Sequence, residues 1–285
     1  MRGIPEGDGQ RAVGERIRSA VALYAALVGA GFRRQWQYKL AMFAGLFTNC
    51  VFGFVRAAVL VAAVDAAGDF AGYDQGSIGA YVWISQGLLG AVQFMAVPLG
   101  ELENRVKTGD IAIDFLRPVD IQCGYLADDL GRAACTFLPR GLPSVLVGTL
   151  TFGLAMPTTP DPYLLGTVSV LLAVVVSFLC RFVVVLIGFW VVDTRGIRAL
   201  YYASGTFLAG LFVPVHMFPS WLATIAAATP FPSILQVPVD VLSGRITGAA
   251  ACSVVAVQVF WVLAIGIAGR VLLVAGRRRL EVQGG

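Results

Sequence analysis

Few side chains of this sequence have the types and spacing of a catalytic site. His216 is the only histidine, which excludes an HExxH zinc site and any metal centre of several histidines. A Ser-His-Asp triad built on His216 would lack the GxSxG turn that usually presents the serine. The two lysines, Lys39 and Lys107, do not follow a glycine, so a GxxxxGK[ST] phosphate loop is also excluded. We therefore expect no cofactor and no bound metal in this chain.

The best remaining group for catalysis is Asp128, Asp129 and Arg132 in the stretch DDLGRAAC. Membrane phosphotransferases bind metal ions through several aspartates, but no second aspartate pair follows here at a suitable spacing. Asp128 and Arg132 are four residues apart, the spacing of an ion pair on one helix face. We favour that structural interpretation, and a membrane-embedded lipid-modifying enzyme stays as the alternative function.

The densest charge lies in residues 101–120, ELENRVKTGDIAIDFLRPVD, where eight of twenty side chains are charged. Leu99, Leu102 and Val106 recur at helical spacing and predict a helix with one apolar stripe. Gly109 can adopt the left-handed conformation that ends such a helix. Asp110 can cap a second short helix, which Arg117-Pro118 would end because the residue before proline avoids helical geometry.

This pattern predicts a helix-Gly-helix elbow over residues 99–118. Its acids and bases are nearly balanced, whereas a membrane surface alone would favour cations. The elbow therefore suits a protein partner with its own charged groove; a solvated loop without a partner is the alternative.

The elements around the elbow are those of an integral membrane protein. The chain of 285 residues is 58% hydrophobic and only 13% charged, about half the charged fraction of a typical soluble domain. Six runs are long and apolar enough to cross a bilayer as helices. They are Leu40–Val64, Ile78–Val97, Phe137–Met156 (within a helix that starts near Ile121), Leu164–Val192, Ile197–Val215 and Ala249–Ala275.

The charges between these runs set the orientation, because cytoplasmic loops retain lysine and arginine. Residues 65–77 and 157–163 carry aspartate and no base, whereas residues 1–39 carry seven bases and the tail carries Arg277, Arg278 and Arg279. Both termini are therefore predicted to be cytoplasmic. The bases lie at the ends of apolar runs rather than on one face, so nucleic acid is not an expected partner. Because residues 1–18 are polar, we expect no signal peptide.

Two further apolar segments are not predicted to cross. Residues 13–36 combine an apolar face with several arginines and predict an amphipathic helix lying on the inner leaflet, in contact with membrane lipids; a short first span is the alternative. Residues 212–248 contain five prolines, which a spanning helix cannot accommodate. They predict short helices folded back into the outer leaflet, with His216 on the outer face.

Two arginines lie inside predicted spans, where a charge costs about 2.5–3.5 kcal/mol even on the gentler insertion scale. Arg56 is two thirds along the first span, where we expect an acid or a carbonyl as its partner, and Arg181 lies in the fourth. For each, two interpretations stay open: a structural partner in the bundle or at a subunit interface, or a polar lining that substrate contacts.

The elbow sequence RVKTGDIAIDFLRPVD between spans two and three resembles the intracellular loop of type 2 ATP-binding-cassette (ABC) transporter permeases, in a bacterial six-span family with the pattern G-x-(I/L)-x-x-x-L-x-R-P. Gly109, Ile111, Phe115, Leu116 and Arg117-Pro118 carry the likeness, although an aromatic and a leucine stand where one leucine is expected. Residues 210–244 resemble the proline-rich outer segment of the same family.

The resemblance implies a permease subunit in the bacterial plasma membrane, paired with a second permease, identical or paralogous, and with two separate ATPase subunits that bind ATP and magnesium. The elbow would be the coupling element, and the outer segment the external gate. The implied coupling residues are Glu101, Glu103, Arg105, Lys107, Gly109, Asp110, Asp114, Phe115, Arg117 and Pro118; the implied gate residues are Pro214, His216, Pro219, Pro230 and Pro232.

The direction of transport, export, follows from the resemblance alone, and the transported substrate stays undetermined. Besides the lipid-modifying enzyme, a membrane scaffold or channel without energy coupling is a third possibility.

Overall fold

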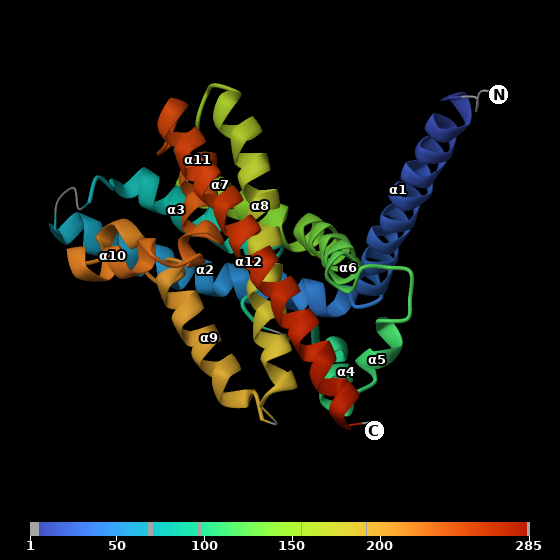
Figure 1. Cartoon of the computed structure of the whole chain (residues 1–285). Helices are drawn as coiled ribbons and strands as arrows, with labels where there is room; N and C mark the ends of the chain where they lie inside the picture. Colours follow the sequence, from blue (N-terminus) through green and yellow to red (C-terminus); the bar gives the residue numbers. More distant parts are fainter. Residues whose placement is uncertain (1–5, 68–70, 96–98, 155, 192, 284–285) are drawn as a thin grey trace, which may run out of the picture.

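The computed structural model describes residues 6–67, 71–95, 99–154, 156–191 and 193–283, and within them the secondary structure is helical. The helices of the first half are α1 (Glu6–Trp36), α2 (Lys39–Ala67), α3 (Gln75–Leu88), α4 (Gly100–Thr108), α5 (Ile111–Asp114), α6 (Ile121–Thr136), the π-helical turn η2 (Phe137–Gly141) and α7 (Leu142–Phe152). Those of the second half are α8 (Asp161–Leu186), η3 (Ile187–Phe189), α9 (Arg195–Leu208), η4 (Val215–Met217), α10 (Ser220–Ala227), η5 (Phe231–Ser233), α11 (Gln236–Leu242) and α12 (Gly248–Gln283). Figure 1 shows their arrangement.

Four helices of the described residues are long and apolar enough to cross a membrane: Lys39–Ala66, Ile121–Phe152, Asp161–Phe189 and Gly248–Leu280. The predicted second and fifth spans correspond to α3 and α9, which have 14 residues each. At 1.5 Å per residue, such a helix is about 21 Å long, shorter than the hydrocarbon core of about 30 Å. As single continuous helices, these two spans are therefore shorter than predicted.

The chain after α3 shows how non-helical backbone is tolerated here. The hydroxyl of Ser177 on α8 accepts a hydrogen bond from the Gln93 N–H at 3.1 Å and donates one to the Gln93 carbonyl at 2.6 Å. Both polar backbone groups of Gln93 are thus satisfied by one buried side chain. Irregular backbone at membrane depth requires this kind of protein partner, because lipid supplies none.

The predicted long third helix is present, since α6, η2 and α7 run on without a break from Ile121 to Phe152. The π-helical turn at Phe137–Gly141 contains Pro139, and Pro143 follows it. Proline has no N–H to donate, and its ring clashes with the carbonyl of the residue four positions earlier. The regular α-helical hydrogen-bond pattern therefore cannot continue through this region.

Helix α1 covers the predicted amphipathic segment and packs along α6. The two backbones approach closely at two glycines: a Cβ on Gly31 would lie 2.2 Å from the Asp128 carbonyl oxygen, and one on Gly131 would lie 2.0 Å from that of Val28. Toward its N-terminus, α1 projects away from the other helices (Figure 1), where Ile17 and Val21 are exposed. The side chain of Val13, part of the predicted apolar face, is outside the described residues.

The proline-rich segment 212–248 forms four short helices, η4, α10, η5 and α11. Pro214, Pro219 and Pro230 each occupy the position directly before one of them. There, the fixed φ of proline suits the start of a helix, and its missing N–H breaks no helical hydrogen bond. In Figure 1, α10 lies at the opposite end of the molecule from α4 and α5.

Candidate functional site

The elbow, residues 99–118, is held to the bundle by the apolar stripe of α4. Leu99, Leu102 and Val106 are buried, as their spacing predicts. They pack in one core cluster with the C-terminal parts of α8 and α12, including Phe182, Val185, Leu186 and Leu273. Gly109 follows α4 with φ 83°, the left-handed conformation that glycine adopts without strain. The prediction that the first helix of the elbow ends at Gly109 is therefore confirmed.

The second half of the elbow differs from the prediction. Asp110 does not cap α5: its backbone is in the right-handed helical region, and its carboxylate instead accepts a hydrogen bond from the Thr108 hydroxyl at 2.7 Å. Helix α5 is a single turn that ends at Asp114, before the predicted Arg117-Pro118. Since an aspartate caps a helix only with extended backbone, the bend at Gly109 leaves Asp110 the wrong dihedral angles.

Glu103 joins α4 to the start of α9. Its buried carboxylate accepts hydrogen bonds from Lys107 at 2.6 Å, Arg198 at 2.7 Å and the Thr194 hydroxyl at 3.1 Å. Burial opposes ionisation of this carboxyl, but the hydrogen bonds from Lys107 and Thr194 and the charge of Arg198 outweigh it and lower the pKa of Glu103. Glu103 therefore links two elements within this chain, and it is not displayed on the surface.

Asp114 has a similar internal role within the elbow. Both of its carboxylate oxygens lie 2.9 Å from one nitrogen of Arg105, and Arg117 is 3.3 Å away. The Asp114 side chain is only 7% exposed, so its charge is enclosed by these two arginines. This contact closes α5 back onto α4 and fixes the angle of the bend.

The exposed tip of the elbow carries a different set of side chains. Ile113 is 55% exposed and Leu116 is 84% exposed, unusually high fractions for large apolar residues. Asp110, Arg117 and Pro118 are exposed beside them, whereas Phe115 is half-buried with the Arg277 guanidinium 5.4 Å from its ring centre. The tip thus offers an apolar pair with flanking charges of both signs.

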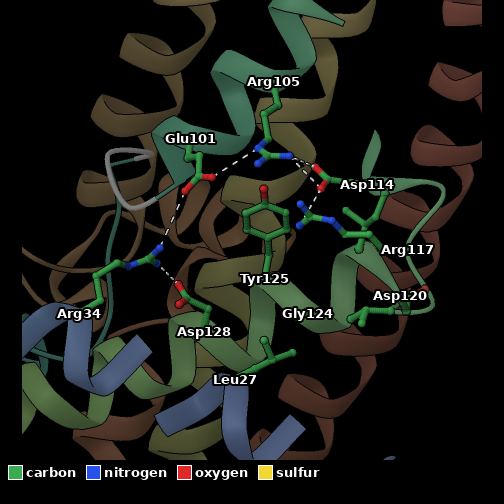
Figure 2. Close-up of a pocket in the computed structure, with 12 residues that line it drawn as sticks. Leu27, Arg34, Glu101, Arg105, Asp114, Arg117, Asp120, Gly124, Tyr125 and Asp128 are labelled. Atoms are coloured by element: carbon green, nitrogen blue, oxygen red, sulfur yellow. Dashed lines mark hydrogen bonds and ion pairs between the residues drawn. The ribbon is translucent and has the colours of Figure 1, made fainter. Parts of the chain in front are cut away.

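A cavity of about 280 Å³ lies between the elbow, α1 and α6. Figure 2 shows acids and bases alternating around it. Arg34 of α1 pairs with Asp128 of α6 and lies 3.9 Å from Glu101, which lies 3.4 Å from Arg105. From sequence, Arg34 is one of the several arginines of the amphipathic helix predicted to contact lipid headgroups, because its ion-pair partners are 67 and 94 positions away.

Behind this cavity lies a buried ion cluster that corrects the predicted pairing of Asp128 with Arg132. Arg132 instead binds Asp129 at 2.7 Å, and the other carboxylate oxygen of Asp129 accepts from Arg181 of α8 at 2.8 Å. Arg132 and Asp129 are three residues apart, the other helical spacing that brings side chains together. Because each aspartate is engaged by arginine, the pair is poorly placed to chelate a metal. Within the described part of the chain, no three acids, histidines or cysteines group as metal ligands.

The two intramembrane arginines thus meet different surroundings. Arg181 has a structural partner in the bundle, Asp129, and also donates to the Ser177 carbonyl at 3.1 Å. Arg56 contacts the Ser85 hydroxyl at 3.2 Å, not the acid or carbonyl that we expected from sequence, and its other two nitrogens find no hydrogen-bond partner among the residues that the structure describes. A third arginine that sequence reasoning passed over, Arg140, donates to the Asn49 side chain at 2.7 Å.

At the opposite end, His216 lies 2.8 Å from Asp240, a buried acid that sequence reasoning did not select. Gln236 donates to both oxygens of Asp240 at 2.9 Å and accepts from the Tyr81 hydroxyl at 2.8 Å. This network ties the proline-rich segment to α3. The only available signal was an isolated acid within an apolar stretch, VPVDVL.

A family model described as "ABC-2 family transporter protein" matches residues 51–284, most of the chain. The chain belongs to the ABC-2 transporter family. It is therefore a multi-pass membrane protein and a membrane component of a transporter. Permeases of the ABC-2 family normally work with ABC ATPase partners. A search of curated proteins finds no match.

Proposed function

We propose that this ABC-2 permease is the membrane subunit of an ATP-driven exporter in a bacterial plasma membrane. It forms the translocation path with a second permease, paralogous or identical. Separate ATPase subunits bind ATP and magnesium. Both termini and the elbow face the cytoplasm, and α3 and α9, continued by the non-helical chain next to them, complete six crossings. Residues 212–248 re-enter the outer leaflet.

The observation that carries the proposal is the contrast between the two sides of the elbow. The side that faces the helix bundle is fixed to α8 and α12 through Leu102 and Val106, and to α9 through Glu103. The side that faces away from the bundle exposes Ile113 and Leu116, which are not covered by the rest of the described chain. An element that is fixed to the helix bundle on one side and presents exposed apolar side chains on the other can transmit force from a docked protein to the bundle.

The contacts also suggest how movement of the elbow reaches the outer side. Glu103 holds Thr194 and Arg198 at the start of α9, and α9 leads directly into the proline-rich segment. When the ATPase subunits close on ATP, the elbow is displaced and pulls α9 with it. The shift opens the outer segment, where the contact between His216 and Asp240 holds the closed state.

Co-purification of the chain with its ATPase subunit tests this proposal. Leu116→Asp places a charge at the apolar tip and is expected to abolish ATPase recovery while the permease stays in the membrane. Thr158→Asp, which places the same charge in an exposed loop next to the distant end of α8, serves as the matched control. Equal recovery of the ATPase with both variants would contradict the proposed docking surface.

A further inference from the structure

The cavity beneath the elbow has the size and polarity of a site for a lipid headgroup. Its volume of about 280 Å³ is near the lower limit of small-molecule sites, about 300–1,000 Å³. Leu27, Val119 and Ile121 supply apolar surface on its lining, and the rest consists of seven charged side chains, Gly124 and Tyr125. In Figure 2, Leu27 of α1 lies at one end, and Arg105, Asp114 and Arg117 lie at the other.

The charges around the cavity balance. Its lining contains four carboxylates, those of Glu101, Asp114, Asp120 and Asp128, and three guanidinium groups, those of Arg34, Arg105 and Arg117. A fourth, on Arg270, lies 2.7 Å from Asp120. A ligand with a net charge would leave an excess of one sign in this partly enclosed site, whereas a zwitterion would not.

The centre of the cavity holds one polar group that the described residues leave without a hydrogen-bond partner. The side chain of Tyr125 on α6 projects into it, and Figure 2 shows the phenol oxygen directed toward Arg105 and Arg117, with no interaction drawn to it. A phenol hydroxyl can donate to a phosphate oxygen, and the arginines beside it can bind the same phosphate.

We propose that this cavity binds the headgroup of a zwitterionic aminophospholipid from the inner leaflet. The phosphate lies against the Tyr125 hydroxyl and Arg117, and the primary ammonium lies beside Glu101 and Asp128, on the other side of Tyr125 in Figure 2. The acyl chains leave past Leu27 along the apolar face of α1. A primary ammonium donates three hydrogen bonds to such carboxylates, whereas a quaternary choline donates none, so phosphatidylethanolamine is favoured over phosphatidylcholine.

Tyr125→Phe provides a clean test, because the lost hydroxyl has no protein partner among the described residues and its removal should leave the fold intact. The full chain is placed in nanodiscs of equal parts phosphatidylethanolamine, phosphatidylcholine and phosphatidylglycerol, and retained lipids are measured by native mass spectrometry. We expect selective retention of phosphatidylethanolamine, reduced about tenfold in Tyr125→Phe by loss of one hydrogen bond to a charged group. Tyr38→Phe, an exposed tyrosine outside the cavity, should bind as the unaltered chain does.

A competition arm separates the headgroup from phosphate alone. Glycerophosphoethanolamine should displace the retained lipid, and inorganic phosphate at the same concentration should not. Equal retention of all three lipids, unchanged binding in Tyr125→Phe or displacement by phosphate would each overturn the proposal. The inference rests on the inner-leaflet placement under the proposed function, but the readout needs no ATPase. Selective lipid binding combined with unchanged ATPase recovery in Leu116→Asp would therefore reject only the proposed coupling.

Discussion

Single side chains in this permease owe their roles to partners that are distant in sequence. Glu103 and Asp114 lie in a stretch whose composition predicts a charged surface, yet both carboxylates are buried. Glu103 is paired with Lys107 and Arg198, and Asp114 with Arg105. Leu116, two positions after Asp114, is the most exposed residue of the elbow's apolar set. At this scale, the exposed surface of the elbow is apolar at Ile113 and Leu116, with charge beside it.

The buried cluster of Asp129, Arg132 and Arg181 gives a prediction at the residue scale. Asp129→Asn leaves two buried guanidinium groups without a counterion, so we expect a loss of stability of about 3–5 kcal/mol. Arg181→Met leaves Asp129 paired with Arg132 alone and should be milder. Thermal unfolding in detergent measures both, with Asp193→Asn at an exposed pair as control. A greater loss for Arg181→Met would show that charge balance does not govern the cluster.

At the scale of elements, glycines decide how closely helices pack. Gly31 and Gly131 let the backbones of α1 and α6 touch, which positions Arg34 beside Asp128 and Glu101. Leu27 and Arg34 of α1, held in this way, line the cavity beneath the elbow. Helix α1 therefore acts as one wall of a site whose other walls are the elbow and α6.

Gly131→Ala tests this role of α1. The added methyl group would lie 2.0 Å from the Val28 carbonyl oxygen, a contact that cannot be accommodated without moving α1. We expect faster cleavage of the α1–α2 junction in limited proteolysis and weaker lipid retention. Gly14→Ala, on the projecting part of α1 where a Cβ meets nothing within 4 Å, should change neither. Identical cleavage of both variants would mean that α1 is held elsewhere.

At the scale of the whole molecule, the elbow and the proline-rich segment occupy opposite ends (Figure 1), which is the separation that a coupled transporter requires. The C-terminal end of α12 lies beside the elbow: Leu280 belongs to the same apolar cluster. The arginines after Ala275 and those of the elbow therefore lie at one end of the molecule, as the positive-inside rule expects of a cytoplasmic face.

Cysteine labelling tests this orientation. In intact cells, a membrane-impermeant maleimide should label Thr158→Cys and not Asp110→Cys. Both positions are exposed; 158 directly precedes α8 and 110 lies between α4 and α5, and Figure 1 shows the start of α8 at the opposite end of the molecule from α4 and α5. Both substitutions are made in a background in which the five native cysteines are replaced. Permeabilised cells, in which both positions should react, provide the control. Labelling of position 110 from outside would invert the topology and remove the basis for coupling.

The sequence by itself determined the membrane class, the family, the apolar stripe of α4 and the turn at Gly109, because hydrophobic length, helical periodicity and glycine geometry are local properties. It could not determine the length of α3 or α9, since their ends depend on partners such as Ser177 and Tyr81 on other helices. Nor could it place Arg181 on Asp129, or Arg34 at the cavity. Those contacts join residues 52 and 94 positions apart, and only the packing of α1, α6 and α8 brings them together.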